Sequence, residues 1–180
     1  GQGIEKAGKH VTILLQKMEG DTMNLYEAIF VRKSVRSYTG ESLSPQVLDK
    51  LKAHFRELTG LFGGIETDMA VLDNRKGQQR MLSLFSVKAP YYLVFYSGEA
   101  PRYLMNMGYL MEQMVLYMCS IGIGTCYIGS NKIRKELQVK DGKKMVGIVA
   151  FGKARGSHVR KQAEARRLTL DQICVFKEVP

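Results

Sequence analysis

The stretch "RKSVRSYTGESLSPQVLDKL", residues 32–51, joins a cluster of cations and hydroxyls to the clearest helix signal in the sequence. Ser44 is a favourable N-cap, and Pro45 suits the first helical position because proline lacks the N–H that would be left unpaired there. Apolar residues then recur at helical spacing from Val47 onward. This pattern predicts a helix within residues 42–58, preceded by a basic segment.

The basic part of this stretch alternates charged and hydroxylated side chains. In an extended segment Arg32, Ser34 and Arg36 would face the same side, because successive side chains of an extended chain point in opposite directions. Arginine binds phosphate as a planar fork, and hydroxyl groups complete the donors around the phosphate oxygens. The segment is therefore either one phosphate-binding face or a solvated basic turn between two helices.

Helix and strand patterns alternate through the rest of the chain. A short helix is predicted over residues 24–33, with Asp21 or Thr22 as its N-cap. Further helices are predicted, after a glycine-rich break, over residues 77–87, 103–120 and 133–139. Strands are predicted over residues 67–73, 89–98, 144–152 and 174–179. This interleaving predicts an α/β or α+β sandwich around a central sheet.

The helix of residues 103–120 begins an apolar run that reaches Ile128 and contains a single charge, Glu112. Glycines and amides interrupt the run and no aromatic belt flanks it, which argues against a membrane span and favours burial in a core or subunit interface. The glycine-dense stretch "GIGTCYIGSN", residues 122–131, is predicted to be a loop. Its glycines would let backbone N–H groups approach a ligand, or Gly122 would simply end the helix in a left-handed conformation.

Composition indicates one domain with anionic ligands. At 180 residues the chain can bury a full core, and we assign residues 22–180 to this domain and residues 1–21 to an N-terminal extension or tag remnant. The formal net charge of +10 leaves a nucleic-acid-binding protein as an open alternative, although the cations are spread without a nucleic-acid motif. Three cysteines without a CxxC pair predict reduced thiols in a cytoplasmic protein that has no metal site.

Three elements occur in a distinctive order along the chain. The basic motif of residues 32–44 comes first, "GIGTCYIG" follows the long helix at residues 122–129, and "VGIVAFG" at residues 146–152 precedes a late "RR" at residues 166–167. This order resembles the nitroreductase-like family of flavin proteins, over roughly residues 24–173. The resemblance implies an α+β fold, a three-layer α/β/α sandwich around a mainly antiparallel central sheet. It also implies a homodimer that holds two FMN molecules at the subunit interface.

The resemblance assigns three groups of residues to the flavin. The opening motif would hold the phosphate and ribityl chain through Arg32, Lys33, Ser34 and Arg36. The segment after the long helix would lie against the ring, with a backbone N–H near N5, through Tyr127, Ile128 and Gly129. A late basic residue would also reach the phosphate, and the resemblance assigns this role to Arg167, or else to Arg166.

The chain departs from the family pattern after its second helix. Many members carry a Ser/Asn-rich run there that ends in Gln-Pro-Trp and contacts the flavin. This chain has "LTGLFGGIETD" at residues 58–68 and no tryptophan, which indicates a divergent branch with different ring contacts.

The activity implied by the resemblance is that of an FMN-dependent NAD(P)H oxidoreductase. The cofactor carries the redox chemistry, so no catalytic side chain is assigned. NAD(P)H would deliver hydride to the flavin, and a small nitroaromatic or quinone-like acceptor would then take the electrons in a ping-pong sequence. Other flavin chemistry on the same fold, such as dehalogenation or flavin fragmentation, and a sensing role remain open alternatives.

Overall fold

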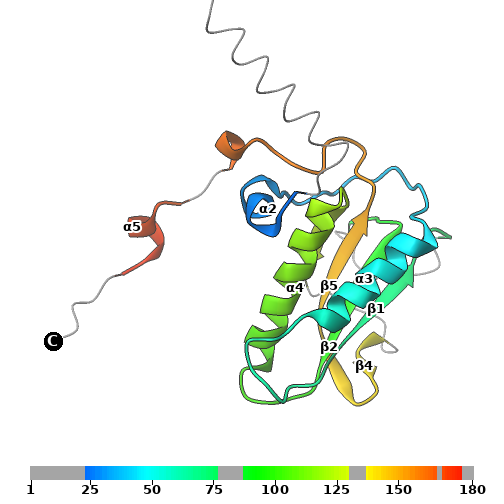
Figure 1. Ribbon diagram of the computed structural model, residues 1–180, viewed down its shortest axis with the longest axis vertical. Helices are drawn as coiled ribbons and strands as arrows, with labels where there is room; N and C mark the ends of the chain where they lie inside the picture. Colours follow the sequence, from blue (N-terminus) through cyan, green and yellow to red (C-terminus); the bar gives the residue numbers. More distant parts are fainter. Residues whose placement is uncertain (1–22, 77–86, 130–136, 166–167, 176–180) are drawn as a thin grey trace, which may run out of the picture.

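An antiparallel sheet with helices packed against it forms the body of the molecule (Figure 1). The computed structural model describes residues 23–76, 87–129, 137–165 and 168–175. Its helices are α2 (Leu25–Val31), α3 (Pro45–Glu57), α4 (Tyr103–Ser120), the 3-10 turn η3 (Gln162–Glu164) and α5 (Leu170–Ile173). Its strands are β1 (Thr67–Asp73), β2 (Tyr91–Ser97), β3 (Gly124–Ile128), β4 (Val139–Lys140) and β5 (Lys143–Gly152). The α+β class is confirmed.

Local capping chemistry explains where the first two helices begin. Ser44 accepts a hydrogen bond from the Val47 N–H at 3.4 Å, and Pro45 occupies the first turn of α3, as predicted. The cap of α2 is Asn24 rather than Asp21 or Thr22, so that prediction was wrong. Asn24 Oδ1 accepts from the Glu27 N–H at 2.9 Å, while Glu27 Oε2 accepts from the Asn24 N–H at 3.2 Å. This reciprocal capping box satisfies two otherwise unpaired donors.

The sheet has the strand order β1-β2-β5-β3, with every neighbouring pair antiparallel and with β4 paired to one end of β5. All seven residues of β2 are buried, because this strand is central and both of its faces are covered. The strand predictions over residues 67–73, 89–98 and 144–152 are confirmed. Together β2 and β5 form the backbone of the core.

The two faces of the sheet carry different cores. Helices α3 and α4 cover one face side by side (Figure 1), where residues such as Phe55 and Met114 pack with Leu93 and Phe151. The opposite face buries Val35, Tyr38, Tyr92, Val94, Tyr96, Cys126, Ile148 and Ala150. No described helix contributes to this second cluster, so the three-layer arrangement stays a prediction.

The prediction of a loop over residues 122–131 was wrong for residues 124–128, which form β3, and residues 130–131 lie outside the described residues. Gly122 does take a left-handed conformation, with φ of +82°, and closes α4 with hydrogen bonds from the Gly122 N–H to Cys119 O and from the Ile123 N–H to Met118 O. The chain then enters β3, in which Cys126 lies opposite Ala150 of β5. Cross-strand pairing of its β-branched and aromatic residues outweighs the glycines that suggested a loop.

Three other predicted elements have mixed outcomes. Residues 77–86 and 133–136 lie outside the described residues, and Val139 belongs to a strand rather than to the predicted helix. Cys174 and Val175 follow the short helix α5 and are not in the sheet, contrary to the strand predicted over residues 174–179, of which 176–180 lie outside the described residues. None of the helices in the described parts of the chain combines the length and apolar character needed to cross a bilayer.

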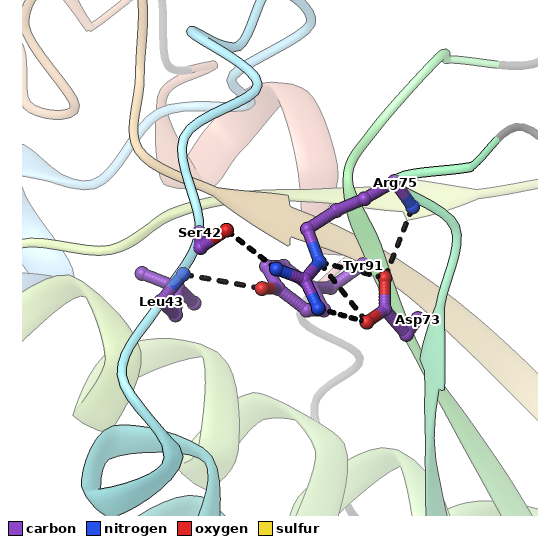
Figure 2. A network of polar contacts seen from close by, with 5 residues as sticks. All are labelled: Ser42, Leu43, Asp73, Arg75 and Tyr91. Atoms are coloured by element: carbon purple, nitrogen blue, oxygen red, sulfur yellow. Dashed lines mark hydrogen bonds and ion pairs between the residues drawn. The ribbon is translucent and has the colours of Figure 1, made fainter.

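A polar network ties the linker before α3 to the sheet (Figure 2). The Leu43 N–H donates to the Tyr91 hydroxyl at 3.1 Å, and the Arg75 guanidinium donates to Ser42 Oγ. Arg75 is itself held by Asp73 at 2.6 Å and lies 5.5 Å from the centre of the Tyr91 ring. These contacts fix the downstream end of the basic motif on the ends of β1 and β2.

Candidate functional site

The basic motif lies as an extended segment along the free edge of β3. Residues 32–38, called here the edge segment, pair in parallel with this strand through Ser34 and Thr125. The Val35 N–H donates to Thr125 O at 2.8 Å. This pairing brings the opening motif beside Tyr127, the first of the predicted ring contacts.

The other side of the edge segment is held by the chain that follows β5. Arg32 pairs with Val159, and the Arg155 N–H donates to Ser37 O at 3.0 Å. Both contacts run antiparallel to the edge segment, so its backbone is bonded on both sides. The motif is therefore an extended, paired segment between α2 and α3 rather than a turn, with Arg36 and Ser37 still exposed to solvent.

Val35 and Tyr38 anchor the edge segment in the second core. Val35 is 5% exposed, and a Cβ placed on Gly124 would lie only 2.9 Å from Val35 Cγ2. The Tyr38 hydroxyl donates to Val35 O at 2.7 Å and lies 3.2 Å from Ala150 O. Burial raises the pKa of Tyr38, so the hydroxyl stays protonated and keeps donating. A glycine at position 124 is what allows the segment to approach β3 so closely.

Arg32 projects toward the long helix, where it meets Glu112. Arg32 Nε lies 3.7 Å from Glu112 Oε1, and the Tyr127 hydroxyl donates to Glu112 Oε2 at 2.7 Å. The Arg32 guanidinium also lies 5.8 Å from the centre of the Tyr127 ring. Burial, the hydrogen bond to Glu112 and the charge of Glu112 all raise the pKa of Tyr127, so its hydroxyl remains neutral. Glu112 therefore orients both a cation and a ring.

Two buried polar atoms in this part of the site have no hydrogen-bond partner among the described residues. They are Arg32 Nη1 and Thr125 Oγ1, and Thr125 as a whole is only 2% exposed. An unpaired buried polar group costs about 1–3 kcal/mol. A ligand with oxygen acceptors could supply the missing hydrogen-bond partners.

The remaining predicted residues lie in several places. Ile128 ends β3 opposite Ile148, and Gly129 follows it as an exposed residue. Arg36 is exposed and forms no ion pair within the described ranges. Lys33 lies on the other side of the edge segment from Arg32, in a hollow that it lines with Arg155. Arg167, like Arg166, lies outside the described residues.

Sequence reasoning missed Glu112 and Thr125 as members of the site. The available signal for Glu112 was its isolation as the single charge of a long apolar run. Thr125 carried no signal, because its position against Ser34 follows from a pairing between distant segments.

The divergent loop after α3 is fixed to the start of α4. The Phe62 N–H donates to Asn106 Oδ1 at 3.0 Å, and the Arg102 guanidinium lies 5.2 Å from the centre of the Phe62 ring. Gly60 leaves no room for a side chain, because a Cβ there would lie 2.4 Å from Asn106 Oδ1. These contacts anchor the loop to the N-terminal end of α4.

The described residues contain no group of three or more metal-ligating side chains that could hold a metal ion. The three cysteines are free thiols; Cys119 and Cys126 are buried and Cys174 is half-buried. Burial, more than the opposing charge of Arg32, raises the pKa of Cys119 and keeps its thiol protonated.

Solved structures similar to this chain share its fold. A nitroreductase family protein from Clostridium difficile 630 is 16% identical and superposes with a TM-score of 0.68, covering 87% of this chain and 100% of that one. A nitroreductase with bound FMN from Desulfitobacterium hafniense DCB-2 is 18% identical, with a TM-score of 0.60 and coverage of 82% and 100%. A protein from Thermotoga maritima MSB8 described as "a putative nitroreductase" is 24% identical, with a TM-score of 0.51, covering 76% of this chain and 51% of that one.

Sequence comparison identifies the family. No curated protein matches the chain. The family profile described as "Putative TM nitroreductase" matches residues 24–180, which include the edge segment, α4 and β3. Since this match spans most of the sequence, the chain belongs to this nitroreductase family, and the fold it shares with the solved structures agrees with that assignment.

Proposed function

We propose that this protein is an FMN-dependent NAD(P)H oxidoreductase that reduces nitroaromatic or quinone-like acceptors. The observation that carries the proposal is the parallel pairing of the edge segment with β3. It brings Arg32 and Ser34 next to Tyr127, so that two motifs far apart in the sequence form one surface. A nitroreductase from Desulfitobacterium hafniense that shares this fold was solved with bound FMN.

The residues present fit a phosphorylated flavin. Arg32 Nη1 is a buried donor without a partner, and Thr125 Oγ1 is a buried hydroxyl without one, within the described part of the chain. Phosphate and ribityl oxygens are acceptors for such donors. In this proposal Arg32, Ser34 and Arg36 hold the phosphate and ribityl chain, and Arg167 adds charge to the phosphate. Lys33, which the resemblance also assigned to the flavin, is left out because it lines the hollow on the other side of the edge segment. Tyr127, Ile128 and Gly129 lie against the ring.

When bound, FMN supplies the redox chemistry, accepting a hydride from NAD(P)H and passing electrons to the acceptor. The protein residues orient and do not need to exchange protons. Glu112 holds the Arg32 guanidinium in place, and its bond to the neutral Tyr127 hydroxyl fixes the ring that would face the flavin. Gly129 is exposed and has no side chain, so a ligand can approach its backbone closely. Pre-organised donors of this kind stabilise developing negative charge without rearrangement.

We also propose that the working form is a homodimer. Leu104, Met105 and Tyr109 form an exposed apolar stripe on α4, and they are 58%, 60% and 42% exposed. The segment with α5 leads away from the sheet (Figure 1) and exposes further apolar side chains, namely Leu168, Leu170, Ile173 and Val175. Apolar surface of this extent is typical of a protein interface. A second copy of the chain would cover both regions.

An absorption spectrum and a flavin titration test the function. We expect the purified protein to carry flavin bands, or to acquire them when the apoprotein is mixed with FMN. NADPH and NADH should then bleach the bound flavin, and nitrofurazone or a quinone should restore its colour. A colourless protein that does not bind added FMN would overturn the proposal. If flavin is reduced but neither acceptor reoxidises it, product analysis with halogenated substrates would identify other chemistry on the same cofactor.

A further inference from the structure

The edge segment has a second polar side that the proposed flavin site does not use. A hollow with a volume of about 270 Å³ lies there, between the edge segment and the chain after β5. We call it the Lys33 hollow, and its lining residues are Lys33, Val35, Ser37, Ala154, Arg155, Gly156 and Ser157. Two cations, two hydroxyls and no carboxylate line it. The chemistry of the hollow is therefore that of an anion site.

The two cations of the hollow are not neutralised by neighbouring carboxylates. Neither Lys33 nor Arg155 forms an ion pair with any described residue. Lys153, only two positions from Arg155, is by contrast neutralised by Glu41 at 2.7 Å. The positive charge of Lys33 also affects His158. The pKa of His158 is lowered mainly by burial and additionally by the charge of Lys33, while a hydrogen bond with the Cys119 backbone acts in the opposite direction. A positive potential is left uncompensated at this point of the surface.

The frame of the hollow is held in place before any ligand arrives. The Arg155 N–H donates to Ser37 O at 3.0 Å, and Tyr38 pairs with Ala154 across the same two segments. Val35 forms part of the lining and is itself anchored in the core at 5% exposure. The backbone at Gly156 is free of a side chain and leaves space, since a Cβ there would meet nothing within 4 Å. The backbone of the hollow therefore needs little ordering when an anion binds.

We propose that the Lys33 hollow is a second anion site, separate from the Arg32 side of the edge segment, that binds a phosphate group of a nucleotide ligand. Lys33 supplies a point charge, Arg155 a planar fork, and Ser37 a hydroxyl donor. The phosphate is that of the dinucleotide donor, since the proposed flavin site already holds the flavin phosphate on the Arg32 side. The site itself does not depend on the proposed redox reaction, because pyrophosphate alone should occupy it.

The test is a calorimetric titration of the full chain with pyrophosphate, at low ionic strength and again near 0.15 M salt, where exposed charges are largely screened beyond about 8 Å. Lys33→Gln and Arg155→Gln remove the two cations of the hollow. Lys153→Gln is the matched control, since it removes the same charge from the same stretch but not from the hollow. Thermal melting of each variant checks that the fold is retained.

We expect Lys33→Gln and Arg155→Gln each to weaken pyrophosphate binding about tenfold or more, as for loss of a charge-assisted hydrogen bond, and Lys153→Gln to weaken it less than about threefold. Equal losses in all three variants would overturn the proposal, since general attraction to a basic protein would then explain the binding. No measurable pyrophosphate binding by the unaltered chain would overturn it as well.

Competition then identifies the source of the phosphate. If NADPH or NADH displaces pyrophosphate from the FMN-loaded protein, the hollow holds the dinucleotide, as proposed. If FMN displaces pyrophosphate from the apoprotein whereas riboflavin does not, the hollow holds the flavin phosphate and is not a second site, which overturns the inference. A protein that binds pyrophosphate in the hollow but never binds FMN would overturn the proposed function while leaving this inference standing.

Discussion

Gly124→Ala tests how the site depends on close packing of the edge segment. A Cβ at this position would lie 2.9 Å from Val35 Cγ2 and 3.0 Å from both Val35 Cβ and Cγ1. The clash is with a buried side chain, and rotation about χ1 cannot relieve it because the Cβ of Val35 itself lies at 3.0 Å. Overpacking of this kind lowers the free energy of unfolding by about 1–3 kcal/mol. Replacing glycine by alanine also reduces the entropy of the unfolded chain, which offsets about 0.4–1 kcal/mol of that loss. We expect a net loss of roughly 1–2 kcal/mol.

The readouts are urea unfolding and FMN affinity, measured on the same preparations. If the strain moves the edge segment away from β3, part of the binding free energy of FMN is used to restore the position of the segment. The free energy of FMN binding is then less favourable by up to about 1–2 kcal/mol, roughly a 5- to 30-fold loss of affinity. Gly98→Ala is the matched control at another strand end. Its Cβ would lie 3.8 Å from the nearest atom, an ordinary contact, so both readouts should stay close to those of the unaltered protein.

A double-mutant cycle gives the decisive comparison. Val35→Ala alone removes two buried methyl groups and should cost about 1.6 kcal/mol plus a cavity contribution. In the double variant the new methyl group at Gly124 occupies part of the vacated space, so the combined cost should be smaller than the sum by at least about 0.5 kcal/mol. Costs that add within about 0.3 kcal/mol would refute the packing argument.

Three further predictions concern the flavin, the pH dependence and the interface. Arg32→Ala combined with Arg36→Ala should weaken FMN binding roughly 100-fold or more, because two charge-assisted contacts are removed, with little change in the melting temperature; unchanged FMN affinity would contradict the assignment. Burial lowers the pKa of His158 in the folded chain, so the unfolded chain binds the proton more readily. Stability should therefore be complete above about pH 6.5 and fall as the pH drops below it, and His158→Gln should flatten this slope in urea titrations between about pH 7 and 5.5. Leu104→Glu on the exposed stripe of α4 should shift the sedimentation profile from dimer to monomer, and a profile identical to that of the unaltered chain would argue against this interface.

The elements that could be predicted from the sequence are those whose signals are local. Ser44 and Pro45 determine where α3 begins, and the seven residues of β2 carry enough β-branched and aromatic side chains to identify a strand without its partners. Asn24 was missed because Asp21 and Thr22 are equally suitable caps by residue type, and only the reciprocal bonds with Glu27 distinguish them.

The parts that could not be predicted depend on pairing between distant segments. The strand β3 forms despite Gly124 because its ladder with β5 supplies the hydrogen bonds, and that ladder leaves no local trace. Arg32 and Lys33 are adjacent in the sequence, and alternation predicts that they face opposite sides. Alternation does not predict that Glu112 lies on one side and Arg155 on the other, because these neighbours come from α4 and from the chain after β5.

The double pairing of the edge segment also determines when the site can assemble during synthesis. Ser34 and Arg32 leave the ribosome early, whereas their partners Thr125 and Val159 are made much later. Contacts between segments this distant along the chain form slowly, because the entropy of closing a long loop is lost before the contacts contribute any stabilisation. The residues up to Gly152 include every strand of the sheet, yet they pair the edge segment on one side only, with β3. Any ligand of this segment is therefore acquired after translation has passed residue 160.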